Sequence, residues 1–310
     1  SLPTTNKESR AWLDYITGEN GIIRSWLRAG ADGWRLDVAD ELPDFVVHAI
    51  HAAARAEKPD AVVIGEVWED ASTKIAYDVR RRHVLGGHCD GVMNYPLRTA
   101  LLDFLLGADG SHFMNVMETL RQNYPRWAYY SCMNSLGTHD TLRALTLLGV
   151  GSDRKGDTSR DWRFNHRLSD DEREIATARL CLGSLLLYAF PGSPTLYYGD
   201  EAGMEGFEDP FNRRTFPWGY EDMDLVGWFT ALGQARKHTQ ALRKGDLTWL
   251  TCEGSVVSFA RTLGDETVIA AVNAGEKEQT VTLPNGGGLT LPPMGGILCR
   301  EDGEVLLQTP

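Results

Sequence analysis

The sequence predicts an α/β fold with parallel strands, followed by a small antiparallel all-β sandwich domain. Over the first 245 residues, short apolar runs with strand character alternate with helical stretches. That alternation is typical of parallel strands joined by crossover helices, in a layered sheet or in a barrel. From Leu247 onward no helical pattern remains, and short β-rich runs are separated by turn sequences such as Asn285–Gly288. We therefore predict one domain over residues 1–245 and a second over residues 246–310.

Five runs in the first domain are predicted to be strands: Trp34–Val38, Ala61–Gly65, Gly91–Asn94, Cys132–Leu136 and Ser193–Tyr198. Four helices are predicted between or after them: Leu42–Glu57, Thr99–Leu106, Asp171–Tyr188 and Asp222–Leu242. In the second domain the predicted strands are Thr248–Cys252, Val256–Thr262, Thr267–Asn273, Gln279–Leu283 and Gly296–Cys299.

The composition excludes several classes of protein. The chain has 310 residues, of which 31 are Lys or Arg and 43 are Asp or Glu, and its net charge is −12. This acidic balance argues against a surface for nucleic acid or for anionic membranes, because both need clustered Lys and Arg. No stretch approaches the ~18 consecutive apolar residues of a transmembrane helix. We expect neither nucleic acid nor a membrane among the partners.

Five cysteines are scattered along the chain without the paired spacing of a zinc site: Cys89, Cys132, Cys181, Cys252 and Cys299. An odd, dispersed set predicts free buried thiols instead of a disulfide framework. Free thiols favour a reducing compartment, so we expect the protein to be cytoplasmic.

The first predicted strand contains two charged residues where apolar ones are expected. Alternation puts Gly33, Arg35 and Asp37 on one face of this strand. A parallel strand that is covered on both faces should be apolar on both. The charged pair is either a structural ion pair or part of a site at the carboxyl end of the strand, which is where active sites of barrels lie.

A second carboxylate follows the next predicted strand. Glu66 shares a face with Val62 and Ile64 and stands at the carboxyl end of that strand. Alone, such a Glu is usually a solvated loop charge or a helper at a helix N-terminus. Two successive strands that end in a carboxylate predict more than that, because two carboxylates across a cleft are what glycoside hydrolysis needs. Metal binding by the same two residues is the alternative.

A third polar step, His139-Asp140, ends the fourth predicted strand. Asp140 could simply cap the next helix. Taken with the two earlier strands, it instead adds a third carboxylate and an imidazole to the same rim.

Three segments that contain these residues resemble, in order and spacing, signature segments of the α-amylase family of glycoside hydrolases: Asp32–Glu41, Gly65–Trp68 and Gly137–Thr141. Two more, Asp90–Pro96 and Asp209–Trp218, resemble the neopullulanase, cyclomaltodextrinase and maltogenic amylase branch. The resemblance extends over essentially the whole chain.

The resemblance implies a role for each residue of the three segments. Asp37 would be the nucleophile, and Arg35 would keep it ionised. Glu66 would protonate the leaving oxygen and then activate water. Asp140 would stabilise the transition state, and His139 would donate to the same sugar ring.

Four further residues are implied to bind substrate. Trp68 and Glu41 match positions that shape the leaving-group side of the family's site, whereas Asp209 and Arg213 match positions that hold the non-reducing side. The resemblance implies no cofactor, although calcium is possible in a full-length enzyme.

One departure from the family changes the expected fold. The family is built on a TIM-type (β/α)8 barrel, and a signature segment ending in Asn-His follows its third strand. That segment does not occur here, and only about five strands precede the β domain, matching the fourth to the eighth. We therefore expect the C-terminal part of such a barrel, and either a missing N-terminal barrel half or self-association to cover its edges.

The expected function is that of a retaining α-glucan hydrolase acting on starch-derived oligosaccharides, cyclodextrins or pullulan, with the isolated chain inactive. The alternatives are a non-catalytic carbohydrate-binding or assembly fragment, and a transglycosylase of the same family.

Overall fold

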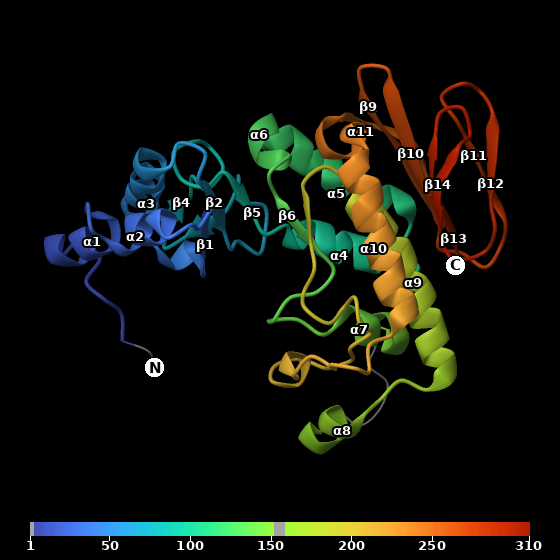
Figure 1. The fold of residues 1–310 in the computed structure, drawn as a ribbon, viewed down its shortest axis with the longest axis horizontal. Coiled ribbons are helices and arrows are strands. Elements are labelled where there is room, and N and C mark those ends of the chain that lie inside the picture. The colour runs from blue at the N-terminus through green and yellow to red at the C-terminus, as the bar shows by residue number, and fades with distance from the viewer. Residues whose placement is uncertain (1–2, 152–158) are drawn as a thin grey trace. The chain divides into compact units, whose positions relative to one another are not determined.

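A computed structural model describes residues 3–151 and 159–310 (Figure 1). The chain forms two compact units. The first consists of residues Ser1–Pro96 and Glu118–Met133, and the second of Leu97–Met117 and Asn134–Pro310. These units follow the packing of the chain, and their boundaries do not coincide with the predicted boundary at residues 245 and 246.

The first unit contains a parallel sheet in the order β1-β2-β5, made of Gly33–Leu36, Val62–Gly65 and Gly91–Val92. An isolated parallel bridge from Met93 to Met133 extends the pairing beyond β5. The remaining elements are α1 (Arg10–Thr17), α2 (Ile22–Arg28), η1 (Ala39–Glu41), α3 (Asp44–Glu57), β3 (Ile75–Ala76), β4 (Val79–Arg80) and α6 (Arg126–Tyr129).

Local sequence explains how tightly this sheet is built. Gly33 begins β1, and a Cβ there would lie 2.1 Å from the carbonyl oxygen of Val62 on β2. Only glycine fits such a close approach of two backbones. One face of α3 covers the sheet region with the buried residues Val46, Val47, Ile50, Ala53 and Ala54.

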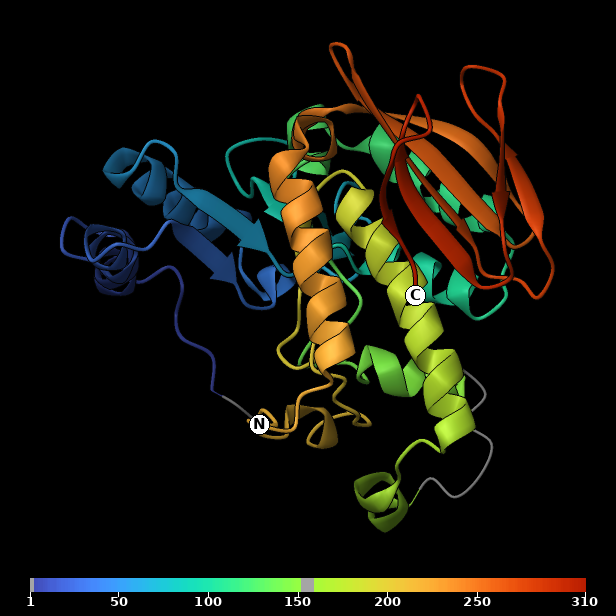
Figure 2. The same cartoon turned by 45° about the vertical axis from the view of Figure 1, so that its right-hand side comes forward.

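The second unit is organised around α9 (Asp170–Ala189), which starts with a capping box between Ser169 and Glu172. Its second half is almost entirely buried. Helix α10 (Met223–His238) packs beside it (Figure 2). Trp228 of α10 donates a 2.8 Å hydrogen bond to Ser184 of α9. The other elements are α7 (Ala144–Val150), α8 (Arg160–Asn165), β7 (Ser193–Thr195), η2 (Phe211–Arg213) and α11 (Gln240–Lys244). Three elements cross a unit boundary: α4 (Tyr95–Leu105), α5 (Gly110–Asn123) and β6 (Met133–Ser135), which pairs with β7.

The end of the chain forms a five-stranded antiparallel sheet in the order β14-β13-β10-β9-β8. Its strands are Asp246–Glu253 (β8), Val256–Leu263 (β9), Glu266–Asn273 (β10), Gly295–Arg300 (β13) and Val305–Gln308 (β14). The hairpin of β11 (Gln279–Thr282) and β12 (Gly288–Leu291) packs on this sheet through a shared apolar cluster that includes Val281, Leu291, Ile269 and Ile297. The antiparallel β region expected from the sequence is confirmed.

The five strands predicted before the β region correspond to β1, β2, β5, β6 and β7, each shorter than predicted. The prediction of one helix over Asp222–Leu242 was wrong, because the chain leaves helical geometry at Thr239, between α10 and α11. Helices α1, α2, α5, α6, α7 and α8 and strands β3, β4, β12 and β14 were not predicted.

Candidate active site

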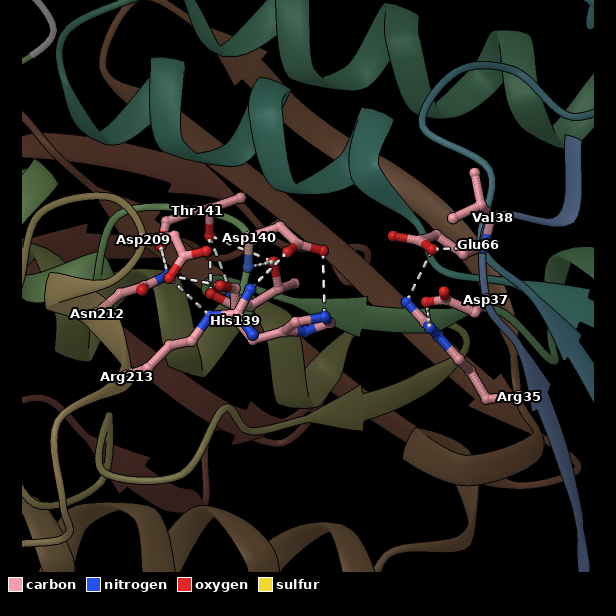
Figure 3. A network of polar contacts seen from close by, with 11 residues as sticks. Arg35, Asp37, Val38, Glu66, His139, Asp140, Thr141, Asp209, Asn212 and Arg213 are labelled. Carbon is pink, nitrogen blue, oxygen red and sulfur yellow. Dashed lines mark hydrogen bonds and ion pairs between the residues drawn. The ribbon is translucent and has the colours of Figure 1, made fainter. Parts of the chain in front are cut away.

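The first candidate cluster stands where β1 and β2 end. Arg35 is the third residue of β1, Asp37 directly follows this strand, and Glu66 directly follows β2. The Nη1 atom of Arg35 lies 2.5 Å from a carboxylate oxygen of Asp37, and its Nη2 atom lies 3.0 Å from Glu66 Oε2 (Figure 3). The structural ion pair that was the alternative interpretation of Arg35 and Asp37 is therefore present, and it includes Glu66.

The two carboxylates of this cluster have opposite environments. The side chain of Asp37 is 77% exposed, whereas that of Glu66 is only 4% exposed. Glu66 Oε2 accepts a 2.7 Å hydrogen bond from the backbone N–H of Val38, which has the left-handed backbone with φ 41°. A β-branched residue adopts this backbone only under constraint. Glu66 is thus a buried, oriented carboxylate, and the interpretation of it as a solvated loop charge is wrong.

Side chains of the long loop after β2 hold the segment after Asp37 through hydrogen bonds and ion pairs. Asp40 accepts from Lys74 at 3.2 Å and from the buried His83 at 2.8 Å. Arg81 donates to the backbone oxygens of Asp40 and Leu42. Burial lowers the pKa of His83, so its imidazole is held neutral at this contact.

The two residues expected on the leaving-group side stand on different segments: Trp68 on the loop after β2, and Glu41 at the end of η1, after β1. Trp68 stacks on Tyr95 with ring centroids 4.1 Å apart and planes 9° apart, and it remains 45% exposed. Glu41 is exposed and accepts a hydrogen bond from the hydroxyl of Tyr77. This bond raises the pKa of Tyr77.

The second candidate cluster belongs to the second unit and follows β6. Asp140 contacts His139 Nε2 at 3.2 Å and Arg213 Nη2 at 3.1 Å. Arg213 also contacts Asp209 at 3.2 Å through Nε (Figure 3). The structure therefore brings His139, Asp140, Asp209 and Arg213 together, four of the residues predicted for the site.

Asp140 does not cap the following helix. Helix α7 begins only at Ala144, and its N-cap residue is Arg143, which makes no side-chain capping bond. The simple capping role considered for Asp140 is therefore wrong.

A buried scaffold, not predicted from the sequence, holds the backbone of this cluster. The side-chain amide of Asn212 donates to the carbonyl oxygens of His139 (2.7 Å) and Thr141 (2.8 Å). The carbonyl of Asn212 in turn accepts a 2.9 Å bond from Nε of Arg143. Both side chains are fully buried. Asn212 thus fixes the backbone on each side of Asp140, and Arg143 holds Asn212 in place.

Arg143 is itself surrounded by partners. Its guanidinium carbon lies 4.2 and 4.7 Å from the ring centres of Tyr197 and Tyr198, a cation–π arrangement. Its Nη1 atom lies 3.2 Å from the buried carboxylate of Asp200. Burial is the main cause that raises the pKa of Asp200 to about 7, against the opposing effect of Arg143. Gly137 makes room for this carboxylate, because a Cβ there would lie 2.7 Å from Asp200 Oδ2.

The structure describes residues 3–151 and 159–310, and the two statements that follow hold for this part of the chain. No group of three or more His, Cys, Asp or Glu side chains is arranged to bind a metal ion. No helix in this part of the chain has both the length and the apolar character needed to span a bilayer.

Comparison with known proteins identifies the family. The family described as "Alpha amylase, catalytic domain" matches residues 2–246, and the one described as "Alpha-amylase C-terminal domain" matches residues 245–289. A solved structure of the debranching enzyme from Nostoc punctiforme superposes with a TM-score of 0.77 at 28% identity, covering 96% of this chain and 62% of that one.

Similarity to two curated proteins indicates the same family. The amylopullulanase of Thermoanaerobacter thermohydrosulfuricus is 35% identical over 335 residues, which cover 96% of this chain and 21% of that protein. The cyclomaltodextrinase of Geobacillus thermopakistaniensis (strain MAS1) is 33% identical, over 85% of this chain and 40% of that protein. This chain spans less than half the length of either relative. The resemblance inferred from the signature segments is confirmed: the chain belongs to the α-amylase family of glycoside hydrolases.

Proposed function

We propose that the whole protein is a retaining α-glucan hydrolase that works by double displacement. The observation that best supports this is the cluster at the ends of β1 and β2, where one guanidinium group, that of Arg35, contacts the carboxylates of Asp37 and Glu66. A retaining glycosidase needs two neighbouring carboxylates with different roles, and here one is exposed and the other buried.

In the first step, a carboxylate oxygen of Asp37 attacks the anomeric carbon while the glycosidic C–O bond breaks. Glu66 gives its proton to the departing oxygen, so the leaving sugar ends with a hydroxyl group. The glycosyl group is then an ester of Asp37. In the second step, Glu66 removes a proton from water, the water oxygen bonds to the anomeric carbon, and Asp37 leaves as a carboxylate.

The second cluster would act on the sugar before the cleaved bond. Asp140 would bind ring hydroxyls and stabilise the oxocarbenium-like transition state, and His139 would donate to the same ring. Asp209 and Arg213 would hold the non-reducing side. Trp68 and Glu41, on the loops after β2 and β1, would shape the leaving-group side.

The proposed substrates are starch-derived oligosaccharides, cyclodextrins or pullulan. The relatives' names, amylopullulanase and cyclomaltodextrinase, support this choice. The proposed mechanism uses no cofactor, and the resemblance allows calcium only in a full-length enzyme. The five free cysteines, four of them buried, support a cytoplasmic location.

We also propose that β1, β2, β5, β6 and β7 are five strands of a (β/α)8 barrel, followed by a C-terminal β-sandwich domain over residues 246–310. The order β1-β2-β5 and the pairing of β6 with β7 follow the chain, as the strands of such a barrel do. Within the described residues, β1 pairs with β2 alone, which leaves one edge for an N-terminal barrel half or a second copy. Because Asp37 is 77% exposed, we expect the chain alone to turn over little substrate.

The test is to assay the whole protein and this chain side by side on maltotriose, β-cyclodextrin and pullulan. We expect hydrolysis by the whole protein and little by the chain alone. Proton NMR of the earliest product should show the α anomer, since two displacements retain configuration. An initial β anomer would exclude the double displacement, and products longer than the substrate would indicate transfer to sugar instead of water.

A further inference from the structure

A short hairpin in the loop after β2 has an unusual turn. Strands β3 and β4 pair antiparallel, with Ala76 opposite Val79, so the turn consists of Tyr77 and Asp78 alone. Both have positive φ, 53° and 60°. A two-residue hairpin turn with positive φ at both positions normally contains Asn, Asp or Gly, because other side chains disfavour this backbone. Asp78 is therefore a usual residue for its position in this turn, whereas Tyr77 is an unusual one.

The hairpin is anchored firmly enough to hold Tyr77 in this conformation. The backbone N–H of Arg81 donates to the carbonyl of Lys74 at 2.8 Å. Lys74 and Arg81 then make side-chain bonds to Asp40, and Arg81 contacts Asp44 at 3.3 Å. Residues whose surroundings hold them in an unfavourable backbone conformation cluster at functional sites. We therefore infer that the position of the Tyr77 ring serves a function.

Tyr77 presents its ring to solvent at a defined orientation. The residue is 71% exposed, although an aromatic side chain of this size is usually half-covered or more. Its hydroxyl donates to the carboxylate of Glu41, four residues after Asp37. The backbone holds one end of the side chain and Glu41 the other, so the exposed ring is fixed without being packed.

We propose that Tyr77 is the stacking platform of a subsite that binds the α-glucan chain beyond the cleaved bond, on the leaving-group side. This proposal rests on the function proposed above. The hairpin belongs to the loop that starts with Glu66, the group that protonates the leaving oxygen, and Tyr77 touches the segment that follows the nucleophile. A flat ring with a fixed polar end suits the apolar face of a glucose unit. The subsite makes longer glucans better substrates than short glycosides.

A purely structural role for Tyr77 makes a different prediction. If the residue only fastened Glu41, removing the hydroxyl would have the whole effect and the ring would have none. If the ring binds sugar, removing the ring has the larger effect. The variants Tyr77→Phe and Tyr77→Asn separate the two. Asn favours left-handed backbone, so Tyr77→Asn keeps the turn while removing the ring.

The experiment measures kcat and KM of the whole protein on maltoheptaose and on p-nitrophenyl α-maltoside, whose p-nitrophenyl leaving group places no glucose unit beyond the cleaved bond. We expect Tyr77→Asn to raise KM for maltoheptaose roughly five- to tenfold, with less than a twofold change for the short glycoside. Tyr77→Phe should change KM for maltoheptaose less than threefold. The control is Val79→Ala, which shortens another exposed apolar side chain of the same hairpin and should change neither constant.

Equal loss on both substrates, or a larger effect of Tyr77→Phe than of Tyr77→Asn, would overturn the proposal. If the wild-type protein hydrolyses neither substrate, the function proposed above fails, and calorimetric titration with maltoheptaose still tests the subsite. In that case the subsite stands if Tyr77→Asn weakens binding at least fivefold relative to wild type and Val79→Ala, and it falls if the three bind alike.

Discussion

The two carboxylate clusters are oriented by different means. In the first, Asp37 and Glu66 follow adjacent parallel strands, and strand pairing sets their spacing while Arg35 links them. In the second, Asp140 stands on a loop, and its geometry depends on Asn212 and Arg143, which bind the surrounding backbone. Two buried polar side chains thus do in the second cluster what the hydrogen bonds between strands do in the first. The geometry of the second cluster should therefore depend more strongly on single side chains than that of the first.

The largest expected effect comes from the three carboxylates. In the whole protein, Asp37→Asn, Glu66→Gln and Asp140→Asn should each lower kcat on maltotriose by about 10³-fold or more, because the groups act as one unit. The melting curve of each variant should match that of wild type. Near-normal turnover by Glu66→Gln would contradict its role as the acid.

The next effect is a pH dependence confined to the second region. The pKa of Asp200 is raised to about 7, from 3.8 in the unfolded chain, so the folded state binds more protons than the unfolded state between these values. Asp200 therefore favours folding at low pH, and this contribution falls as pH rises from about 4 to 7, by at most ~4 kcal/mol. Denaturant unfolding at several pH values should show that loss in wild type but not in Asp200→Asn. Parallel pH profiles for the two proteins would contradict the assignment.

Arg35→Lys tests the link between the first two carboxylates. Lysine has one ammonium group and cannot contact Asp37 and Glu66 through separate nitrogens of a planar group. We expect a loss in kcat/KM of about 100-fold, or ~2.7 kcal/mol. Arg213→Lys is the matched substitution in the second cluster, and since Asp140 also contacts His139 we expect about tenfold. Equal losses would show that the two clusters do not differ in this respect.

The smallest effect concerns the scaffold. Asn212→Ala removes one buried and one part-buried hydrogen bond to backbone carbonyl groups and should lower the free energy of unfolding by ~2 kcal/mol. The control is Asn165→Ala, which removes a single exposed bond to the carbonyl of Asp161 and should change stability by less than ~0.5 kcal/mol. Urea unfolding of both variants measures the difference. Similar values for the two would mean that Asn212 does not orient the second cluster.

The sequence predicts the parts of the site that break a pattern. Arg35 and Asp37 interrupt a predicted strand that should be apolar, Glu66 follows the next strand, and His139-Asp140 follows another, so position alone indicates them. Arg143 and Asn212 break no pattern. Their hydrogen bonds in this scaffold join residues 69 to 73 positions apart, and nothing local in the sequence encodes such contacts.

The elements of the fold likewise divide into those that the sequence predicts and those that it does not. The buried strands were predicted because apolar runs between turns identify them, whereas the two-residue strands β3 and β4 are too short to show a period. The prediction also omits α5, although Phe113, Met117 and Leu120 are spaced as one buried helix face. That omission is an error of interpretation, since the signal is present.

The contact between α9 and the C-terminal sheet has a consequence for how the chain unfolds. Helix α9 packs against β10 and β13, and a Cβ at Gly296 of β13 would lie 3.1 Å from Leu182 of this helix. Arg261 of β9, fully buried, donates to the carbonyls of Ala189 at the end of α9 and of Gly245. A protein cut at residue 245 would expose the part of α9 that β10 and β13 cover, and it would lose the bonds from Arg261 to those two carbonyls. The sheet and α9 should therefore open together, and their amide protons should exchange with deuterium as one cooperative group.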